Sequence, residues 1–124
     1  MPVRLLDRTR YLVIAYLGPN VLTDQQLWTS ISRSLLRLYG EQGAARTGLY
    51  LIEHDSEKQQ AILRATNKSI NMVRATLCSI IEINGETILL FVTNVSGTIK
   101  GAKKKIIPLN EFIDSFHEEN MGDN

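Results

Sequence analysis

The sequence predicts an α/β sandwich of the α+β class, in which a four-stranded antiparallel sheet carries two helices on one face and a further helix follows at the C-terminus. Strand-like and helix-like segments alternate as strand–helix–strand–strand–helix–strand, which is the split βαβ arrangement. The 124 residues, 44% of them hydrophobic, are enough for one domain with a hydrophobic core. We expect that domain over residues 1–119, including a C-terminal helix over 108–119, and a polar tail over 120–124.

The first strand and the first helix have clear ends in the sequence. Arg10–Leu17 is rich in Tyr, Val, Ile and Leu and stops at Gly18-Pro19-Asn20, which favours a buried strand followed by a turn. Thr23 and Gln26 then have the spacing of a capping box. Apolar side chains recur at helical spacing up to a glycine, so we expect a helix over residues 24–39. Its apolar stripe consists of Leu27, Ile31, Leu35 and Leu38, widened by Trp28 and Tyr39.

Two strands, a second helix and a last strand complete the order. Gly48–His54 and Gln59–Thr66 are strand-like runs joined by a polar loop of hairpin length. Ser69 is expected to cap the second helix. Asn84-Gly85 either ends that helix or forms a hairpin turn, and the sequence leaves both open. Glu86–Asn94 is the last predicted strand.

The last strand is apolar on both faces. A strand with one open face should alternate apolar and polar residues, so we expect a cover over the second face of the sheet, supplied by the C-terminal segment or by a partner. The candidate residues for that cover, which have helical spacing, are Leu109, Phe112, Ile113 and Phe116.

The charge is distributed unevenly along the chain. Residues 108–124 hold five of the 13 acidic residues and none of the 14 lysines and arginines, so residues 1–107 have a formal net charge of +6. A basic domain of this size is compatible with RNA binding. The apolar runs are too short to span a bilayer, no secretory signal is visible, and one cysteine suits a reducing compartment. We therefore expect a cytoplasmic protein with no membrane partner.

Catalytic and metal sites have little support in the sequence. His54 and His117 are the only histidines and Cys78 is the only thiol, and none are paired at ligand spacing. We interpret Cys78 as a small core residue and His54 as an ordinary surface imidazole. P-loop, dinucleotide and nucleophile-elbow fingerprints are absent. We expect no catalytic residue, no metal ligand and no cofactor on this chain.

Base stacking on the sheet is also disfavoured. RNA-recognition modules of this architecture present aromatic rings on their central strands. Gln59–Thr66, which should carry the main aromatic motif, contains none, and Tyr11 and Tyr16 lie on opposite faces of the first strand. Binding through charge and the phosphate backbone remains open.

The strongest candidate binding segment begins at Ser96-Gly97-Thr98. If Thr98 starts a helix, lysines three and four residues apart share one face, while Ile99, Ala102 and Ile106 face inward. Free backbone amides at a helix N-terminus, backed by lysines, suit a phosphate group. A solvated helix face and ordinary flanking charge are the alternatives. The candidate RNA-contacting residues are Arg8, Arg10, Gly97, Thr98, Lys100, Lys103, Lys104 and Lys105.

Two patterns at the ends of the predicted domain resemble a known family. Arg10-Tyr11-Leu12, and Ser96-Gly97-Thr98-Ile99-Lys100 followed by basic residues and Ile106-Ile107, are similar to the small ferredoxin-like protein subunit of archaeal and eukaryotic ribonuclease P. In archaea the family is called RNase P protein component 2. The resemblance covers roughly residues 8–107, and the short length looks archaeal. The related eukaryotic pattern has Gly-Gly-Thr where this chain has Ser96-Gly97-Thr98.

The resemblance implies a ferredoxin-like RNA-binding domain that acts as a non-catalytic subunit. In that family an RNA cleaves the 5′ leader from precursor tRNA with Mg²⁺ at the RNA active site. The implied partners are the ribonuclease P RNA, a TIM-barrel protein subunit and a second copy within a dimer of heterodimers, with precursor tRNA contacted indirectly. The alternative function is a ferredoxin-like regulatory or scaffolding domain that dimerises and binds a small molecule or protein without RNA. An acylphosphatase-like enzyme is discounted, because Gly18-Pro19-Asn20-Val21 lacks the arginine that it needs.

Overall fold

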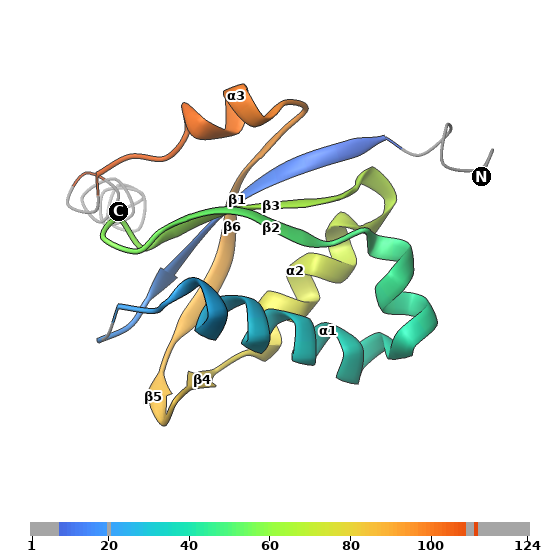
Figure 1. Ribbon diagram of the computed structural model, residues 1–124, viewed down its shortest axis with the longest axis horizontal. Helices are drawn as coiled ribbons and strands as arrows, with labels where there is room; N and C mark the ends of the chain where they lie inside the picture. Colours follow the sequence, from blue (N-terminus) through green and yellow to red (C-terminus); the bar gives the residue numbers. More distant parts are fainter. Residues whose placement is uncertain (1–7, 20, 109–110, 112–124) are drawn as a thin grey trace, which may run out of the picture.

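The fold is a two-layer sandwich with a short third layer on its far side (Figure 1). This computed structural model describes residues 8–19, 21–108 and 111. The sheet has strand order β2-β3-β1-β6, and its paired strands are antiparallel. Helices α1 and α2 cover one face, here called the helix face, and α3 lies on the other (Figure 1). The elements are β1 (Thr9–Leu17), α1 (Asp24–Thr47), β2 (Tyr50–Asp55), β3 (Gln60–Thr66), the 3₁₀ turn η2 (Asn67–Ser69), α2 (Ile70–Ser79), β4 (Glu82–Ile83), β5 (Glu86–Thr87), β6 (Leu89–Ser96) and α3 (Ile99–Lys103).

The predicted ferredoxin-like split βαβ sandwich is thus confirmed. The strands predicted first and third in the chain, β1 and β3, are the central ones, and β2 and β6 form the edges. The C-terminal helix predicted over 108–119 falls almost wholly outside the described residues, as does the expected cover by apolar residues 109–116.

Helix α1 begins as the sequence predicts and continues further. The capping box is formed: Thr23 Oγ1 accepts from the Gln26 amide at 3.1 Å, and Gln26 Oε1 accepts from the Thr23 amide at 2.9 Å. Gly40, with φ of 72° and ψ of 177°, breaks the helix after residue 39. A second helical stretch then runs to Thr47 and ends at Gly48, whose φ of 60° is left-handed. The predicted helix end is therefore a break between two helical stretches.

Asn84-Gly85 forms a hairpin turn and does not end α2, which stops at Ser79. Positive φ angles of 55° at Asn84 and 81° at Gly85 fit the turn types that the right-handed twist of a hairpin favours. The strand predicted over residues 86–94 is divided, because β5 pairs with β4 while β6 joins the main sheet.

The hydrophobic core is divided between the two faces of the sheet. The larger cluster lies on the helix face and contains fifteen buried residues, among them Leu12, Ile14 and Leu63. The smaller cluster, on the opposite face, contains three: Val13, Ile62 and Ala102. Within the described residues, α3 covers part of the second face, which was expected to be covered by the C-terminal segment or a partner.

Three interpretations of single residues are wrong. Leu38 is 43% exposed, because the apolar stripe of α1 loses its cover in the last turn before the break at Gly40. Cys78 is exposed, because Thr76 and not Cys78 lies on the buried side of α2. The Thr76 hydroxyl donates to the Met72 carbonyl at 2.8 Å. His54 lies within β2, opposite Ala61, and its imidazole is buried.

Candidate nucleic-acid interface

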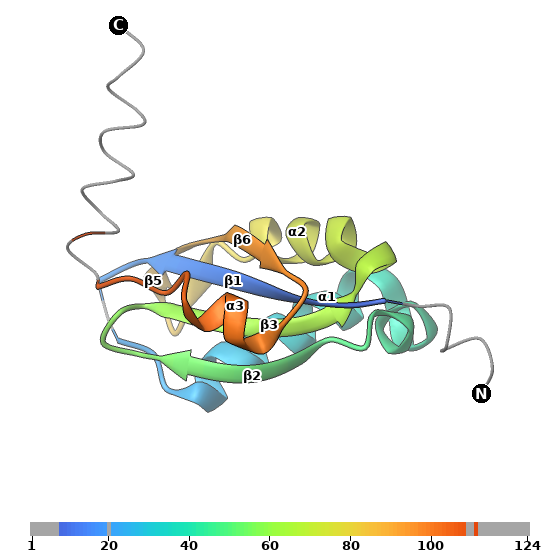
Figure 2. The same cartoon turned by 90° about the horizontal axis from the view of Figure 1, so that it is seen from above.

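Residues 97–107, here called the lysine strap, cross the face of the sheet opposite α1 and α2, here called the strap face. The strap starts after Ser96, which pairs with Tyr11 at the beginning of β1, and α3 lies over the central strands (Figure 2). At its other end the Ile107 amide donates to Gln60 Oε1 at 3.3 Å, and the Ile107 carbonyl accepts from Gln60 Nε2 at 2.6 Å. Gln60 is buried, so the strap is anchored to the sheet at both ends.

A helix starts at Thr98, as considered from the sequence, but side chains cap its first turn and occupy amides that were expected to be free. Thr98 is the N-cap, and its Oγ1 accepts from the Gly101 amide at 2.9 Å. Ser96 Oγ accepts from the Thr98 amide at 3.2 Å. With five residues, α3 is also too short for a strong helix dipole. The amides that Thr98 and Ser96 occupy are therefore not available to a phosphate, and the positive charge of this segment comes from its lysines.

Gly101, and not Gly97, is the glycine that the strap requires. A Cβ at Gly101 would collide with Ser96 Oγ and would lie 3.0 Å from Thr98 Oγ1. No atom of the described residues lies within 4 Å of the position that a Cβ would take at Gly97, and the φ of Gly97 is not in the left-handed region. The signal in the sequence that points to Gly101 is its position three residues after Thr98, where the N-cap hydroxyl meets the first turn of α3. The hydroxyl of Ser96 approaches the same turn.

The four lysines of the strap are exposed. Lys100 and Lys104 are one helical turn apart, which places them on the same side of α3. Lys103 differs, because its Nζ lies 3.4 Å from Glu53 Oε1 on β2. This ion pair is solvent-exposed and worth little to stability, but it shares the Lys103 charge with a carboxylate.

The inward face of the strap matches the prediction in part. Ala102 is fully buried on Val13 and Ile62, and Ile106 packs against the same cluster. Ile99, which was expected to face inward, is 37% exposed.

The two predicted arginines lie at the end of the sheet where the strap begins. The Arg8 carbonyl accepts from the Asn67 amide at 2.6 Å, which ties the start of β1 to the end of β3. Arg8 is exposed. Arg10 points to the helix face, because successive side chains of a strand alternate and Tyr11 lies on the strap face. The structure thus brings Arg8 and Arg10 to the same end as Thr98 but separates Arg10 from the lysines.

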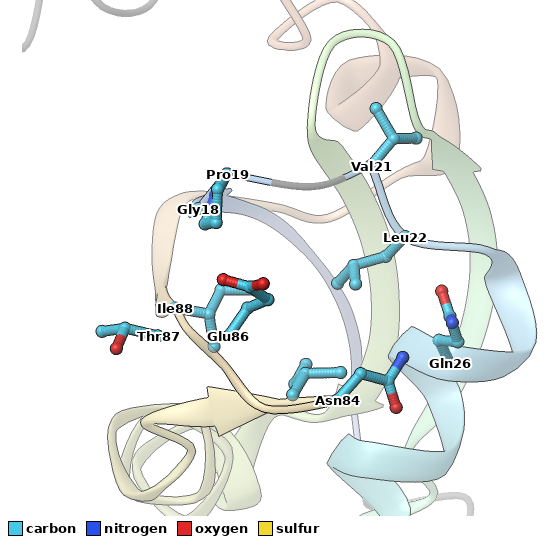
Figure 3. Close-up of a pocket in the computed structure, with 10 residues that line it drawn as sticks. Gly18, Pro19, Val21, Leu22, Gln26, Asn84, Glu86, Thr87 and Ile88 are labelled. Atoms are coloured by element: carbon cyan, nitrogen blue, oxygen red, sulfur yellow. The ribbon is translucent and has the colours of Figure 1, made fainter.

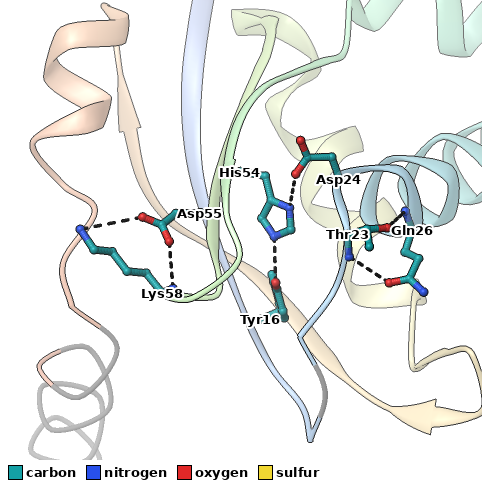
Figure 4. A network of polar contacts seen from close by, with 7 residues as sticks. All are labelled: Tyr16, Thr23, Asp24, Gln26, His54, Asp55 and Lys58. Carbon is teal, nitrogen blue, oxygen red and sulfur yellow. Dashed lines mark hydrogen bonds and ion pairs between the residues drawn. The ribbon is translucent and has the colours of Figure 1, made fainter.

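A polar network that joins the buried His54 imidazole to an exposed carboxylate lies at the opposite end of the sheet, beside the start of α1 (Figure 4). His54 Nδ1 is 2.8 Å from Asp24 Oδ1, and His54 Nε2 is 2.8 Å from the Tyr16 hydroxyl. A neutral imidazole satisfies both contacts, because Nδ1–H donates to the carboxylate and Nε2 accepts from the phenol. Burial raises the pKa of Tyr16 and the nearby carboxylates of Asp24 and Asp55 raise it further, against a lowering backbone hydrogen bond at Leu22. The network joins β1, β2 and α1.

A pocket of about 320 Å³ lies between the β1–α1 connection and the β4–β5 hairpin (Figure 3). Its lining mixes aliphatic side chains, amides, a hydroxyl and a carboxylate, without a basic residue, so it does not suit a phosphate. The lining residues are Gly18, Pro19, Val21, Leu22, Gln26, Ile83, Asn84, Glu86, Thr87 and Ile88.

Metal-ligating groups are not gathered in the part of the chain that the structure describes, where no three His, Cys, Asp or Glu side chains are grouped to hold an ion. In the same residues, no helix combines the length and the apolar character needed to cross a membrane.

The chain is similar to archaeal ribonuclease P proteins. Ribonuclease P protein component 2 of Pyrococcus furiosus is 31% identical over 107 residues, which are 86% of this chain and 89% of the relative. The protein of the same name from Thermococcus kodakarensis is 29% identical with the same coverage. That from Archaeoglobus fulgidus is also 29% identical and covers 86% of this chain and 95% of the relative.

A solved structure has the same fold. A chain in the cryo-EM structure of yeast ribonuclease MRP superposes with a TM-score of 0.61 at 10% identity, over 90% of this chain and 93% of the other. The model of the Rpp14/Pop5 family matches residues 10–107, from the start of β1 to the end of the lysine strap. The resemblance predicted from two short motifs is therefore confirmed, and this chain belongs to the Rpp14/Pop5 family.

Proposed function

We propose that this chain is a non-catalytic protein subunit of ribonuclease P, which binds and supports the RNA that removes the 5′ leader from precursor tRNA. The observation that carries the proposal is the family match over residues 10–107, which includes both layers of the sandwich and the whole lysine strap. The relatives named ribonuclease P protein component 2 align over most of their own length, which supports the same role here.

The proposed RNA contact is the lysine strap. Its ammonium groups project from a segment that the buried Ala102 and the Gln60–Ile107 hydrogen bonds hold on the sheet. Each lysine that neutralises a phosphate releases a condensed counterion, so such a surface binds RNA in a salt-dependent way. Thr98 acts by capping α3, and Gly97 precedes this cap at a position that does not require glycine. Arg8 would extend the contact beyond the start of the strap, and Arg10 would add a separate cation on the helix face of the same end of the sheet.

The chemistry in this proposal belongs to the RNA, with Mg²⁺ at the RNA active site. This chain supplies positive charge and a rigid support, together with a TIM-barrel protein subunit and, in a dimer of heterodimers, a second copy of itself. Precursor tRNA is contacted through the assembly, in the cytoplasm.

Reconstitution tests the function. The purified chain is added with a candidate TIM-barrel subunit to ribonuclease P RNA, and cleavage of precursor tRNA is measured at limiting Mg²⁺. We expect the pair to raise the cleavage rate and to lower the Mg²⁺ concentration that half-maximal activity needs. A variant with Lys100→Ala and Lys104→Ala should require more Mg²⁺ than the wild type.

The matched control replaces Arg33 and Arg37, two exposed residues that have the same i,i+4 spacing on α1. It removes the same charge outside the strap and should leave the RNA contact as it is. Absence of stimulation by the wild-type pair would contradict the assignment to ribonuclease P.

A further inference from the structure

Three side chains form one row across the strap face at the end where the strap begins. Arg64 on β3 pairs with Tyr50 on β2 and with Tyr11 on β1. Side chains of directly paired residues point to the same face of a sheet, so both tyrosines flank the arginine there. Ser96, the last residue of β6, pairs with Tyr11 and continues the row toward α3. Although β3 itself contains no aromatic residue, its two neighbouring strands bring rings to its face.

The Tyr50 ring is held in place and remains open to solvent. The Arg64 guanidinium carbon lies 5.6 Å from the centre of that ring, which is cation–π distance. Tyr50 lies on the edge strand β2, so Trp28 of α1 reaches its ring around the outer edge of the sheet and meets it edge-on, with 5.9 Å between ring centres and 63° between planes. Tyr50 is nevertheless 54% exposed, and Arg64 is exposed beside it. An aromatic ring and a planar cation therefore stand together at the edge of the sheet.

Basic residues surround this row. Arg8 and Lys68 are exposed at the same end of the sheet, where the Asn67–Arg8 hydrogen bond joins the β1 and β3 ends. Lys100 stands on the strap that begins beside Tyr11. The nearby carboxylate of Glu53 is already paired with Lys103. A nucleotide whose base lay on the row would thus have cations on two sides for its phosphates.

We propose that Tyr50 and Arg64 form a stacking site for one unpaired RNA base, an inference that rests on the proposed role in binding RNA. A base has a π-face that stacks on a tyrosine ring or on a guanidinium plane, whatever its identity. A base inside a duplex is covered by its neighbours and cannot use the site. Tyr11, packed against the small cluster under α3, fixes the inner end of the row. The strap then holds the backbone and the row holds one base.

The site can be observed directly, because Trp28 is the only tryptophan of the chain and touches Tyr50. The probes are a single-stranded oligoribonucleotide and a fully paired RNA duplex of the same length. With the wild type, the single strand should produce a saturable change in tryptophan fluorescence that the duplex does not produce.

Three substitutions separate stacking from charge. Tyr50→Ala should weaken binding of the single strand by roughly 10-fold and leave duplex binding unchanged. Tyr50→Phe keeps the ring and should bind as the wild type does. Arg64→Gln, which leaves Tyr50 in place, should weaken single-strand binding and serves as the second variant if Tyr50→Ala does not fold. The double variant of Lys100 and Lys104 should weaken both RNAs.

The binding results for these variants distinguish a failure of the stacking site from a failure of the proposed function. If the lysine variant weakens both RNAs but Tyr50→Ala and Arg64→Gln weaken neither, the stacking site is wrong and the proposed function stands. If the wild type binds neither RNA, the proposed RNA contact is wrong as well. If Tyr50→Ala instead reduces self-association or capture of the TIM-barrel subunit with unchanged RNA binding, the row is a protein interface and the stacking proposal is overturned.

Discussion

The helix face and the strap face share the same central strands but differ in how much they bury. Among the residues that the structure describes, fifteen buried residues form the cluster on the helix face, against three on the strap face. Hydrophobic stabilisation scales with apolar area removed from water, so the helix face supplies most of the fold's stability. The strap face carries a five-residue helix, four exposed lysines and a row with two tyrosines. Because the helix face supplies the stability, the strap face can keep its lysines and tyrosine rings accessible to solvent.

The largest expected effect comes from two neighbours on β3. Leu63 and Ile62 are both fully buried, on the helix face and the strap face respectively. Leu63→Ala should lower the free energy of unfolding by about 2–5 kcal/mol and leave the RNA affinity of the folded protein unchanged. Ile62→Ala should cost less stability, because α3 can settle into the space, and should weaken RNA binding because the strap loosens.

Urea unfolding and RNA titration of the two variants check this division. Equal losses of stability with equal RNA affinities would show that the two faces do not differ as described.

The next largest effect is expected from alanine substitutions at the two glycines of the strap, which should differ in stability. Gly101→Ala should destabilise α3 by about 1–3 kcal/mol, because the new Cβ collides with Ser96 Oγ. Gly97→Ala should change the free energy of unfolding by no more than about 0.5 kcal/mol, because no atom of the part of the chain that the structure describes lies near its Cβ position. Hydrogen exchange of the Ala102 amide, which donates to the Thr98 carbonyl, reports on the strap alone. Faster exchange in the Gly97 variant than in the Gly101 variant would contradict the contact assigned to Gly101.

A third prediction concerns pH and the polar network of the helix face. The raised pKa of Tyr16 means that the folded state holds the phenol proton more tightly than the unfolded chain, where the pKa is about 10. Its stabilising contribution is complete below about pH 10 and is lost as the pH rises through the folded value. At pH 7, Tyr16→Phe should cost roughly 1 kcal/mol through the lost hydrogen bond to His54.

Unfolding free energies measured from pH 8 to pH 11 test this sign. The wild type should lose more stability over this range than the Tyr16→Phe variant. Tyr50→Phe makes the same substitution at an exposed tyrosine of the strap face and is the matched control. The assignment fails if the Tyr16 and Tyr50 variants give the same profile.

The smallest expected effect is a change in RNA affinity when the ion pair of Lys103 is removed. Glu53→Gln removes the partner of Lys103 and should raise RNA affinity about twofold, with little change in stability. Glu57→Gln is the matched control, because it makes the same change of net charge in the β2–β3 loop, where Glu57 is exposed. RNA affinity is measured by titration at low salt. An equal gain in affinity for both variants would mean that the affinity depends on net charge alone and not on the pairing of Lys103.

Features of the two faces that depend on local signals could be predicted from the sequence, and features that depend on contacts between elements could not. Helical spacing and the Thr23 capping box are local signals, and they gave the element order and the start of α1. Which side of an element is buried depends on its neighbours, so His54 and Cys78 were misplaced. The Tyr50–Arg64–Tyr11 row depends on strand register, which a bulge between Leu51 and Glu53 shifts within β2. The requirement at Gly101 arises from the side chain of Ser96 folding back onto the strap.

The central claim is that the strap face binds RNA through its lysines. The most direct measurement is the affinity for ribonuclease P RNA over a series of salt concentrations, for the wild type and for the variant with Lys100→Ala and Lys104→Ala. We expect the slope of log affinity against log salt to become shallower by about 1.5 for the two lost phosphate contacts, while the Arg33 and Arg37 control keeps the wild-type slope. A strap variant with the wild-type slope would contradict the claim.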